Sequence, residues 1–228
     1  MEATSLQAEL RKCLKKVADP IRAPQMQKYM KSAMPFYGVP APQLKLILRV
    51  LLKDLKYKNQ AEWQRVVLLI WQGAKFREER YAALALLRHR SAQEFKNLKQ
   101  LPLLKKLIKV GAWWDFVDEI ASHSLCDLFQ VDEKIMTLEM TKWSSDKNLW
   151  VRRAAIISQL NRKEKTNTQL LFSCIQSNLH SKDFFINKAI GWALRQYARI
   201  DAKEVRHFVN QNSQKLAPLS IREALKHL

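Results

Sequence analysis

Apolar residues recur along this chain at a helical spacing. In segments such as 43–55 (QLKLILRVLLKDL) and 79–90 they fall at positions i, i+3, i+4 and i+7, the pattern of a helix with one buried face. The strict alternation of apolar and polar residues that would indicate strands is nowhere sustained. The pattern therefore predicts an all-α protein.

Helix-breaking residues divide the chain into segments of ordinary helix length. They occur at Asp19-Pro20, Ala23-Pro24, Gly38-Val39-Pro40 with Pro42, Leu101-Pro102, Ser144-Ser145-Asp146 and Ala217-Pro218-Leu219-Ser220. Only four glycines occur in 228 residues, too few for a sheet protein rich in tight turns. We expect a row of helices that forms a single domain over residues 1–228.

Four short segments in the second half of the chain are spaced 35 residues apart: 115–118 (DFVD), 150–153 (WVRR), 185–188 (FINK) and 220–223 (SIRE). The next two positions are small or apolar in the last three segments. A period of about 35 to 45 residues is typical of stacked helical pairs, either TPR or HEAT-like. The glycine and tyrosine positions of the TPR consensus are missing. We therefore predict a HEAT-like solenoid, an α-α superhelix.

Equivalent positions in stacked repeats lie along one face, and here they hold Asp118, Arg153 and Lys188. The repeat therefore predicts a charged row on that face. The concave face of such a stack is an extended surface that could follow a duplex.

The chain is strongly basic, with 40 Lys and Arg against 21 Asp and Glu, a formal net charge of +19. This excess indicates a polyanionic partner, as in ribosomal, chromatin, membrane-surface and DNA-repair proteins. The excess of positive charge does not indicate which reaction, if any, the protein catalyses.

Several classes of protein are disfavoured by missing signals. Cys13, Cys126 and Cys174 form no CxxC pair, and no histidine lies at a zinc-ligand spacing. Walker, GxGxxG, HExxH and GxSxG motifs do not occur. No apolar run is long enough to span a bilayer. We expect a soluble monomer without metal or cofactor, located in the cytoplasm and, in a bacterium, associated with the nucleoid.

The string 113–118 (WWDFVD) sets two indoles and two carboxylates at the expected start of a helix. Trp114 and Asp118 share a helix face at i and i+4, whereas Trp113 points about 100° away, so one indole would be core and the other exposed. A purely structural interpretation is also open, in which both tryptophans pack and Asp115 caps the helix. Arg153 and Trp192 likewise have ordinary surface or core interpretations.

Four ordered segments together resemble the AlkD family of alkylpurine DNA glycosylases: 28–31 (KYMK), 113–118 (WWDFVD), 150–155 (WVRRAA) and 184–192 (FFINKAIGW). The segment 216–220 is also similar, and the resemblance covers nearly the whole chain. It implies a HEAT-like stack with a basic concave face that binds double-stranded DNA. The implied activity is hydrolysis of the N-glycosidic bond of N3- or N7-alkylated purines, without base flipping.

The resemblance also implies roles for particular residues. Asp118 matches the catalytic carboxylate, and Trp114 and Trp192 match the paired tryptophans of the cleft. The expected DNA contacts are Tyr29, Arg153, Lys188 and Arg195. Residues 39–45 depart from the family pattern, because they lack its Thr-Pro and paired arginines.

Two other functions are compatible with the repeat. A non-catalytic HEAT-like DNA-binding module would explain both repeat and charge, and Asp118 discriminates against it because a carboxylate repels phosphates. A protein-binding adaptor would leave the charge of +19 unexplained.

Overall fold

The computed structural model describes residues 3–228 of the chain and is all-helical. Fourteen α-helices and no strands occur in that range. The chain packs as two compact units, 1–95 and 96–228. The all-α prediction is confirmed, while the single domain and the concave basic face stay predictions.

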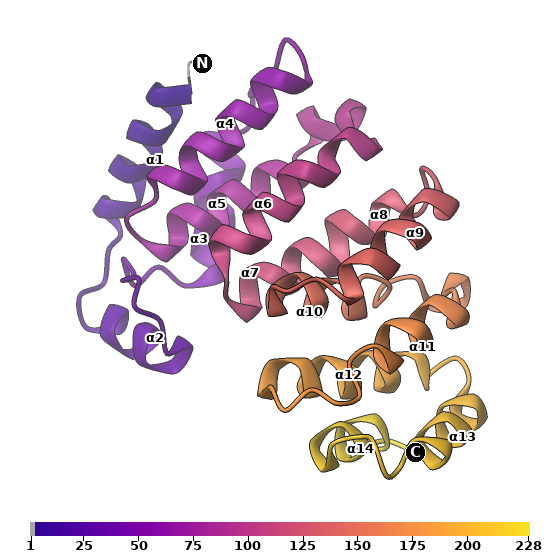
Figure 1. Cartoon of the computed structure of the whole chain (residues 1–228). Coiled ribbons are helices and arrows are strands. Elements are labelled where there is room, and N and C mark those ends of the chain that lie inside the picture. Colours follow the sequence, from indigo (N-terminus) through magenta and orange to yellow (C-terminus); the bar gives the residue numbers. More distant parts are fainter. Residues whose placement is uncertain (1–2) are drawn as a thin grey trace. The chain divides into compact units, whose positions relative to one another are not determined.

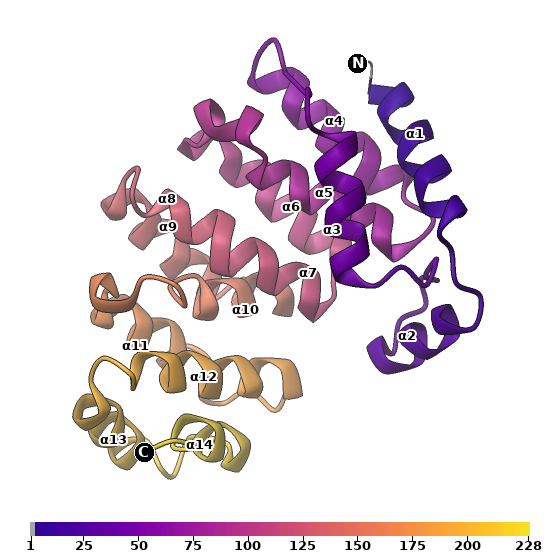
Figure 2. The same ribbon diagram turned by 180° about the vertical axis from the view of Figure 1, so that it is seen from behind.

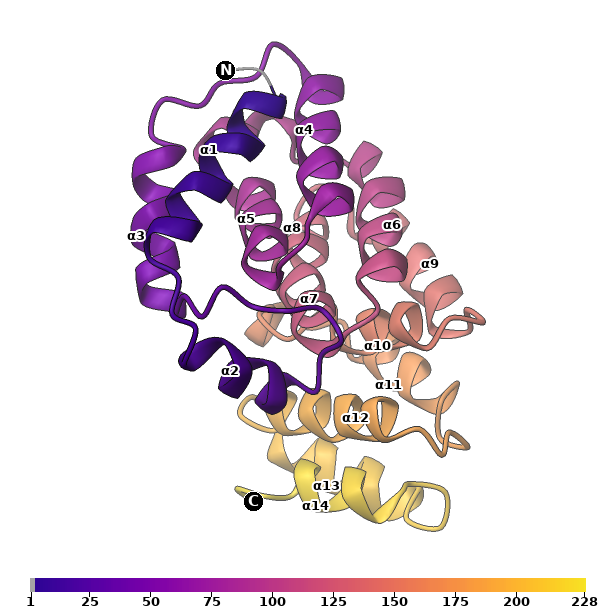
Figure 3. The same ribbon diagram turned by 90° about the vertical axis from the view of Figure 1, so that its left-hand side faces the viewer.

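The first unit contains five α-helices and ends in a 3-10 segment. They are α1 (Ala3–Lys16), α2 (Arg22–Met30), α3 (Ala41–Leu51), α4 (Gln60–Gly73), α5 (Arg77–Arg88) and η1 (Arg90–Phe95). Helix α1 packs against α3, α4 and α5, as Figure 3 shows. Trp63 of α4 is fully buried, and its indole N–H donates to the Leu86 carbonyl of α5 at 3.1 Å. A buried tryptophan with a satisfied N–H contributes both apolar area and orientation to this core.

Two buried carboxylates hold the segment that precedes α3. Glu78 of α5 accepts hydrogen bonds from the backbone N–H groups of Tyr37, Gly38 and Val39 at 3.0, 3.0 and 3.1 Å. Its neighbour Glu79 accepts from the Tyr37 hydroxyl and from Arg11 of α1. Gly38 has a φ of 87°, and a Cβ there would lie 2.2 Å from the Asp19 carbonyl oxygen. Glycine is therefore required at this turn.

The second unit contains nine α-helices, connected by short 3-10 and π segments. They are η2 (Leu98–Gln100), α6 (Leu101–Gly111), α7 (Trp114–Glu119), η3 (Ile120–Leu125), α8 (Cys126–Leu128), α9 (Glu133–Ser144), α10 (Leu149–Ile157), η4 (Lys163–Lys165), α11 (Thr168–Gln176), α12 (Phe184–Tyr197), α13 (Ala202–Gln211) and α14 (Pro218–Ala224). Figures 1 and 2 show two columns within this unit, one of α9, α11 and α13 and the other of α7, α10, α12 and α14. The second column carries every segment of the 35-residue repeat.

The helix starts repeat with the same period. The N-cap residues of α10 and α12 are Asn148 and Asp183, 35 residues apart, and each side chain accepts from two backbone N–H groups of the first turn. In the other column, Asp132, Asn167 and Asp201 cap α9, α11 and α13, and each side chain accepts from one backbone N–H group of the first turn. Such caps each stabilise a helix by about 1 kcal/mol. The repeat inferred from the sequence is thus also a repeat of helix boundaries.

The helix that begins at Trp114 changes its winding after one and a half turns. Residues Ile120–Leu125 form a π-helical turn between α7 and α8. The Ser122 hydroxyl donates to the Asp118 carbonyl at 2.6 Å, and the side chain of Asn161 donates to the Ser122 carbonyl at 2.8 Å. Turns of this kind are rare and are frequent at functional sites.

Candidate active site and nucleic-acid interface

Asp118 of α7 and Arg153 of α10 form a buried ion pair. Arg153 Nε donates to Asp118 Oδ1 at 2.7 Å, and Nη2 donates to Oδ2 at 2.8 Å. The two side chains are only 12% and 4% exposed. Parallel bonds of this kind fix the plane of a carboxylate as well as its position. Asp118 is therefore held in one orientation.

The ionisation of Asp118 reflects two opposing influences. Burial raises the pKa of the carboxyl above its ordinary value, and the hydrogen bonds and charge of Arg153 oppose that rise. The negative charge of Asp115, one turn earlier, adds to the rise. Arg153 thus favours the ionised form of a carboxyl that burial alone would tend to protonate.

Arg153 also connects α10 to α12. Its Nη1 donates to the carbonyl of Phe185, whose ring packs against Trp150 and Trp113 with centroids 4.9 and 5.7 Å away. Trp113, the N-cap residue of α7, lies 6.0 Å from Trp150. These aromatic contacts, worth about 1 kcal/mol each, fix the starts of α7, α10 and α12 relative to one another.

The two adjacent tryptophans at the start of α7 differ from the prediction in one respect. Trp113 and Trp114 are both half-buried, so the expectation of one core and one exposed indole is wrong. The reason is that Trp113 precedes the helix in extended backbone, where the 100° rotation per residue does not apply. Trp114 begins α7 one turn before Asp118, and Trp192 of α12 is also half-buried.

Lys188 and Arg195 of α12 share a carboxylate that the sequence analysis did not select. Lys188 Nζ lies 2.8 Å from Oε1 of Glu223 on α14, and Arg195 Nη1 pairs with Oε2 of the same side chain. The pKa of Glu223 falls to about 2 because both cations donate hydrogen bonds to it. A signal for Glu223 was present, since it lies 35 residues after Lys188 in the repeat.

The charged row predicted from the repeat therefore consists of ion pairs. Asp118 pairs with Arg153 and Lys188 with Glu223, and each pair joins equivalent positions of consecutive repeats. Opposite charges at stacked positions meet because adjacent repeats place them on neighbouring helices.

Tyr29 belongs to the first unit. It lies on α2 with 79% of its surface exposed, beside the exposed Lys28. Lys31 ends this helix in a left-handed conformation, with a φ of 47°. An exposed tyrosine between two lysines suits contact with a polyanion, because the ring can stack and the cations can bind phosphate.

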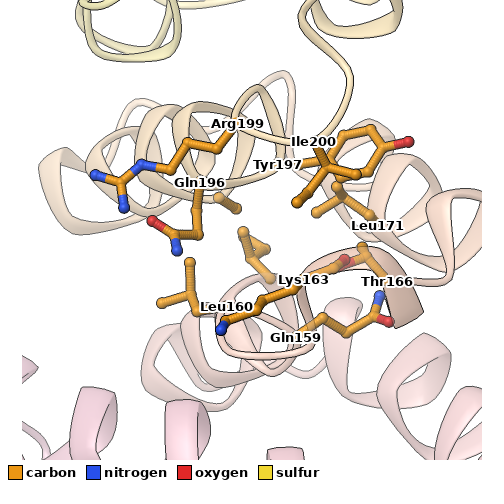
Figure 4. A pocket seen from close by; sticks show the side chains of 11 residues that line it. Gln159, Leu160, Lys163, Thr166, Leu171, Gln196, Tyr197, Arg199 and Ile200 are labelled. Carbon is orange, nitrogen blue, oxygen red and sulfur yellow. The ribbon is translucent and has the colours of Figure 1, made fainter.

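A separate pocket of about 230 Å³ lies at the far ends of α10 and α12 (Figure 4). Its walls include Gln159, Leu160, Ala193, Tyr197 and Arg199. Ala193 and Tyr197 occupy a different face of α12 from Lys188, Trp192 and Arg195. None of the residues expected at the site lines this pocket.

Residues 3–228 lack two further kinds of feature. This range contains no cluster of three or more His, Cys, Asp and Glu side chains that could hold a metal ion. It also contains no helix long and apolar enough to cross a bilayer.

The fold defines a helical-repeat protein, and its net charge of +19 favours a polyanionic partner. The family model described as DNA alkylation repair enzyme matches residues 10–228, and the chain belongs to this family. Its partner is therefore DNA, and the family is consistent with the AlkD resemblance.

A solved structure, a predicted DNA alkylation repair enzyme from Enterococcus faecalis, is similar with a TM-score of 0.84 and 30% identity. The match covers 92% of this chain and 96% of that chain. No protein of curated function matches the sequence.

Proposed function

We propose that this enzyme of DNA alkylation repair is a monofunctional glycosylase. Its substrates would be N3- and N7-alkylated purines in duplex DNA, and its reaction hydrolysis of the N-glycosidic bond. The observation that carries the proposal is the oriented Asp118 carboxylate, bound bidentately by Arg153 and one helical turn from Trp114. A desolvated carboxylate with a specific charge partner, at a position that matches the family's catalytic residue, is a candidate for chemistry.

The reaction suits a single carboxylate. An N3- or N7-alkylated purine is already cationic, so the bond to C1′ breaks with both electrons leaving on a neutral base. No general acid is needed for that departure. The deoxyribose becomes oxocarbenium-like, and an anion beside it stabilises the developing charge. Water then adds to C1′ and loses its proton to Asp118 or to solvent.

Arg153 limits which of these roles Asp118 performs well. Each carboxylate oxygen has two lone pairs, and Arg153 occupies one on each oxygen. The other two can face the sugar and the attacking water. Because a bound guanidinium lowers the basicity of a carboxylate, we assign Asp118 mainly to electrostatic stabilisation and to orienting water.

The remaining residues receive roles that follow from their chemistry. The indoles of Trp114 and Trp192 would stabilise the cationic base and sugar through their electron-rich faces. Tyr29, Lys188 and Arg195 would contact the DNA backbone. Arg153 uses three of its five N–H groups on Asp118 and Phe185, so it would offer at most two to a phosphate.

The lesion is proposed to stay stacked in the duplex. A flipped base needs a pocket beside the catalytic group. The pocket in Figure 4 lies elsewhere on α12, and the resemblance to the AlkD family is what supports a mechanism that reads the duplex from its backbone and sugar.

The decisive experiment measures release of 7-methylguanine and 3-methyladenine from methylated duplex DNA under single-turnover conditions. Asp118→Asn should bind duplex DNA at least as tightly as the unmodified protein, because a charge that repels phosphates is removed, and should release base at least about a hundredfold more slowly. Asp115→Asn is the matched control, since it removes the same charge one turn earlier and should stay within about twofold.

A second function is favoured by one observation. The charge of Asp118 is fully paired with Arg153, so the pair could serve only to join α7 to α10 in a non-catalytic DNA-binding module. If the unmodified protein binds duplex DNA but releases neither base above a protein-free control, the glycosylase proposal fails and this module takes its place.

A further inference from the structure

Trp192 lies between two cations on one face of α12. Lys188, Trp192 and Arg195 are spaced at i, i+4 and i+7, so their side chains project from the same side of the helix. Lys188 is 40% exposed at its side chain and Arg195 is 22% exposed. Both lie three or four residues from Trp192 on the helix, a spacing at which side chains can meet.

An indole between two cations would ordinarily attract them. A lysine or arginine within about 6 Å of a tryptophan ring gains roughly 0.5 to 2 kcal/mol by lying over its face. In this protein Arg80 lies over Trp71 and Lys105 over Trp143 in that manner, at 5.0 and 5.2 Å from the ring centroids. Within residues 3–228, Trp192 has no such contact with Lys188 or Arg195.

The carboxylate of Glu223 accounts for this difference. It binds Lys188 through one oxygen and Arg195 through the other, and its side chain is only 13% exposed. Each cation is thus paired with a carboxylate of α14 instead of lying over the ring. Its pKa of about 2 keeps it ionised at any pH at which the reaction would be assayed.

Helix α14 is docked closely enough to make these contacts. A Cβ on Gly191 would lie 2.5 Å from the Cβ of Glu223 and 2.9 Å from the Ser220 carbonyl oxygen. The Ser220 hydroxyl donates to the Asn187 carbonyl at 2.8 Å. Glycine next to Trp192 therefore permits the close approach that brings Glu223 to the two cations.

We propose that Glu223 is a positioning residue that tethers Lys188 and Arg195, so that the face of Trp192 stays available to a cationic substrate. The inference rests on the proposed function of Trp192. A positively charged purine or sugar must compete for this face with the protein's own cations. Glu223 removes that competition, and its negative charge also weakens the general attraction between α12 and DNA phosphates.

The test is the variant Glu223→Gln, which keeps the size of the side chain and removes its charge. Single-turnover release of 7-methylguanine at saturating enzyme should fall about five- to tenfold, the range expected from the loss of one cation–π contact. Binding of undamaged duplex should become tighter, and its dependence on salt steeper by about one phosphate contact. A residue with a merely structural role would not raise DNA affinity while lowering the rate.

Two controls separate the mechanism from general effects. Glu133→Gln removes an ion-paired carboxylate from α9 and should leave both measurements unchanged. In a Lys188→Gln, Arg195→Gln background, adding Glu223→Gln should have no further effect on the rate, because the tethered cations are gone. Thermal unfolding of each variant confirms that it is folded.

The outcomes are distinct. If the unmodified protein releases no base, the proposed function fails. If it releases base and Glu223→Gln reacts at the same rate, or if the loss persists without Lys188 and Arg195, Glu223 does not act by tethering and the inference is overturned.

Discussion

The guanidinium of Arg153 meets the carboxylate of Asp118 edge to edge, with bonds of 2.7 and 2.8 Å, across the interface of α7 and α10. The pair is 35 residues apart in sequence, one period of the repeat. A buried pair of this geometry is strongly coupled, since removal of either partner leaves the other charge without compensation. The orientation of Asp118 therefore depends on Arg153.

Replacing Arg153 tests this dependence. Arg153→Lys keeps the positive charge but cannot form two parallel bonds, and Arg153→Gln removes the charge. We expect Arg153→Gln to lose about 3 kcal/mol of folding stability and Arg153→Lys less. Both should slow base release by at least about tenfold at saturating enzyme. Chemical denaturation and single-turnover kinetics measure the two effects.

The control for Arg153 is Arg152, its neighbour on α10, which is half-buried and donates only to the backbone carbonyls of Asp146 and Lys147. Arg152→Gln should retain the rate of base release. Equal loss in both variants would show that the charge of α10, rather than the bond to Asp118, matters.

The pKa of Asp118 predicts where the rate of base release falls at acidic pH, the acidic limb of the pH–rate profile. Only the ionised carboxylate can stabilise an oxocarbenium-like sugar, so the rate should fall as pH decreases through this pKa, about tenfold per pH unit below it. Burial raises the pKa of Asp118, and the limb should therefore lie above the ordinary aspartate value of 3.8.

A pH series of single-turnover rates, corrected for spontaneous release without protein, checks this prediction. In Arg153→Gln the limb should move to higher pH, because the guanidinium no longer opposes the rise. A limb at or below 3.8 in the unmodified protein would contradict the assignment of Asp118 as a buried catalytic anion.

The repeat and the column of α7, α10, α12 and α14 were predictable because their signals are local or periodic. Fixed intervals separate cap residues such as Asn148 and Asp183, and also the small residues after Arg153 and their equivalents. When repeats stack, residues one interval apart lie next to each other. The ion pairs were not predicted. The repeat shows which charged residues occupy equivalent positions, but not whether their side chains project separately or contact one another. Glu223 was missed for the same reason, although its position in the repeat was evident.

Other features left no signal in the sequence. The π-helical turn of residues Ile120–Leu125 contains no proline or glycine, and depends on bonds such as that from Asn161 to the Ser122 carbonyl. Glu78 and Glu79 sit at the start of an amphipathic helix, where carboxylates usually face water. Their partners lie about 40 residues earlier or more, and no spacing rule connects them.

Tyr29 tests the contribution of the first unit to DNA binding. With 79% exposure it adds little to folding, so Tyr29→Ala should change the unfolding free energy by less than about 0.5 kcal/mol. Affinity for duplex DNA should fall by about tenfold, the effect of losing one aromatic contact of roughly 1.4 kcal/mol. Ile21→Ala is the matched control, as Ile21 is an equally exposed side chain at the start of the same helix. Equal losses of affinity in the two variants would remove the specific role of Tyr29.

Glu78 is expected to be essential for the stability of the first unit and dispensable for chemistry. In Glu78→Gln one oxygen becomes an amide NH₂ group, which cannot accept from the backbone N–H of Tyr37 or from those of Gly38 and Val39. Leaving a buried donor unsatisfied costs about 1 to 3 kcal/mol, and the midpoint of urea unfolding should fall accordingly. The helices that carry the candidate site, α7, α10, α12 and α14, lie in the second unit, so the folded variant should release base at the unmodified rate. If the variant has normal stability, water must satisfy the backbone N–H groups that have lost their acceptor. If it is stable but releases base more slowly, the 37–39 segment contributes to the chemistry.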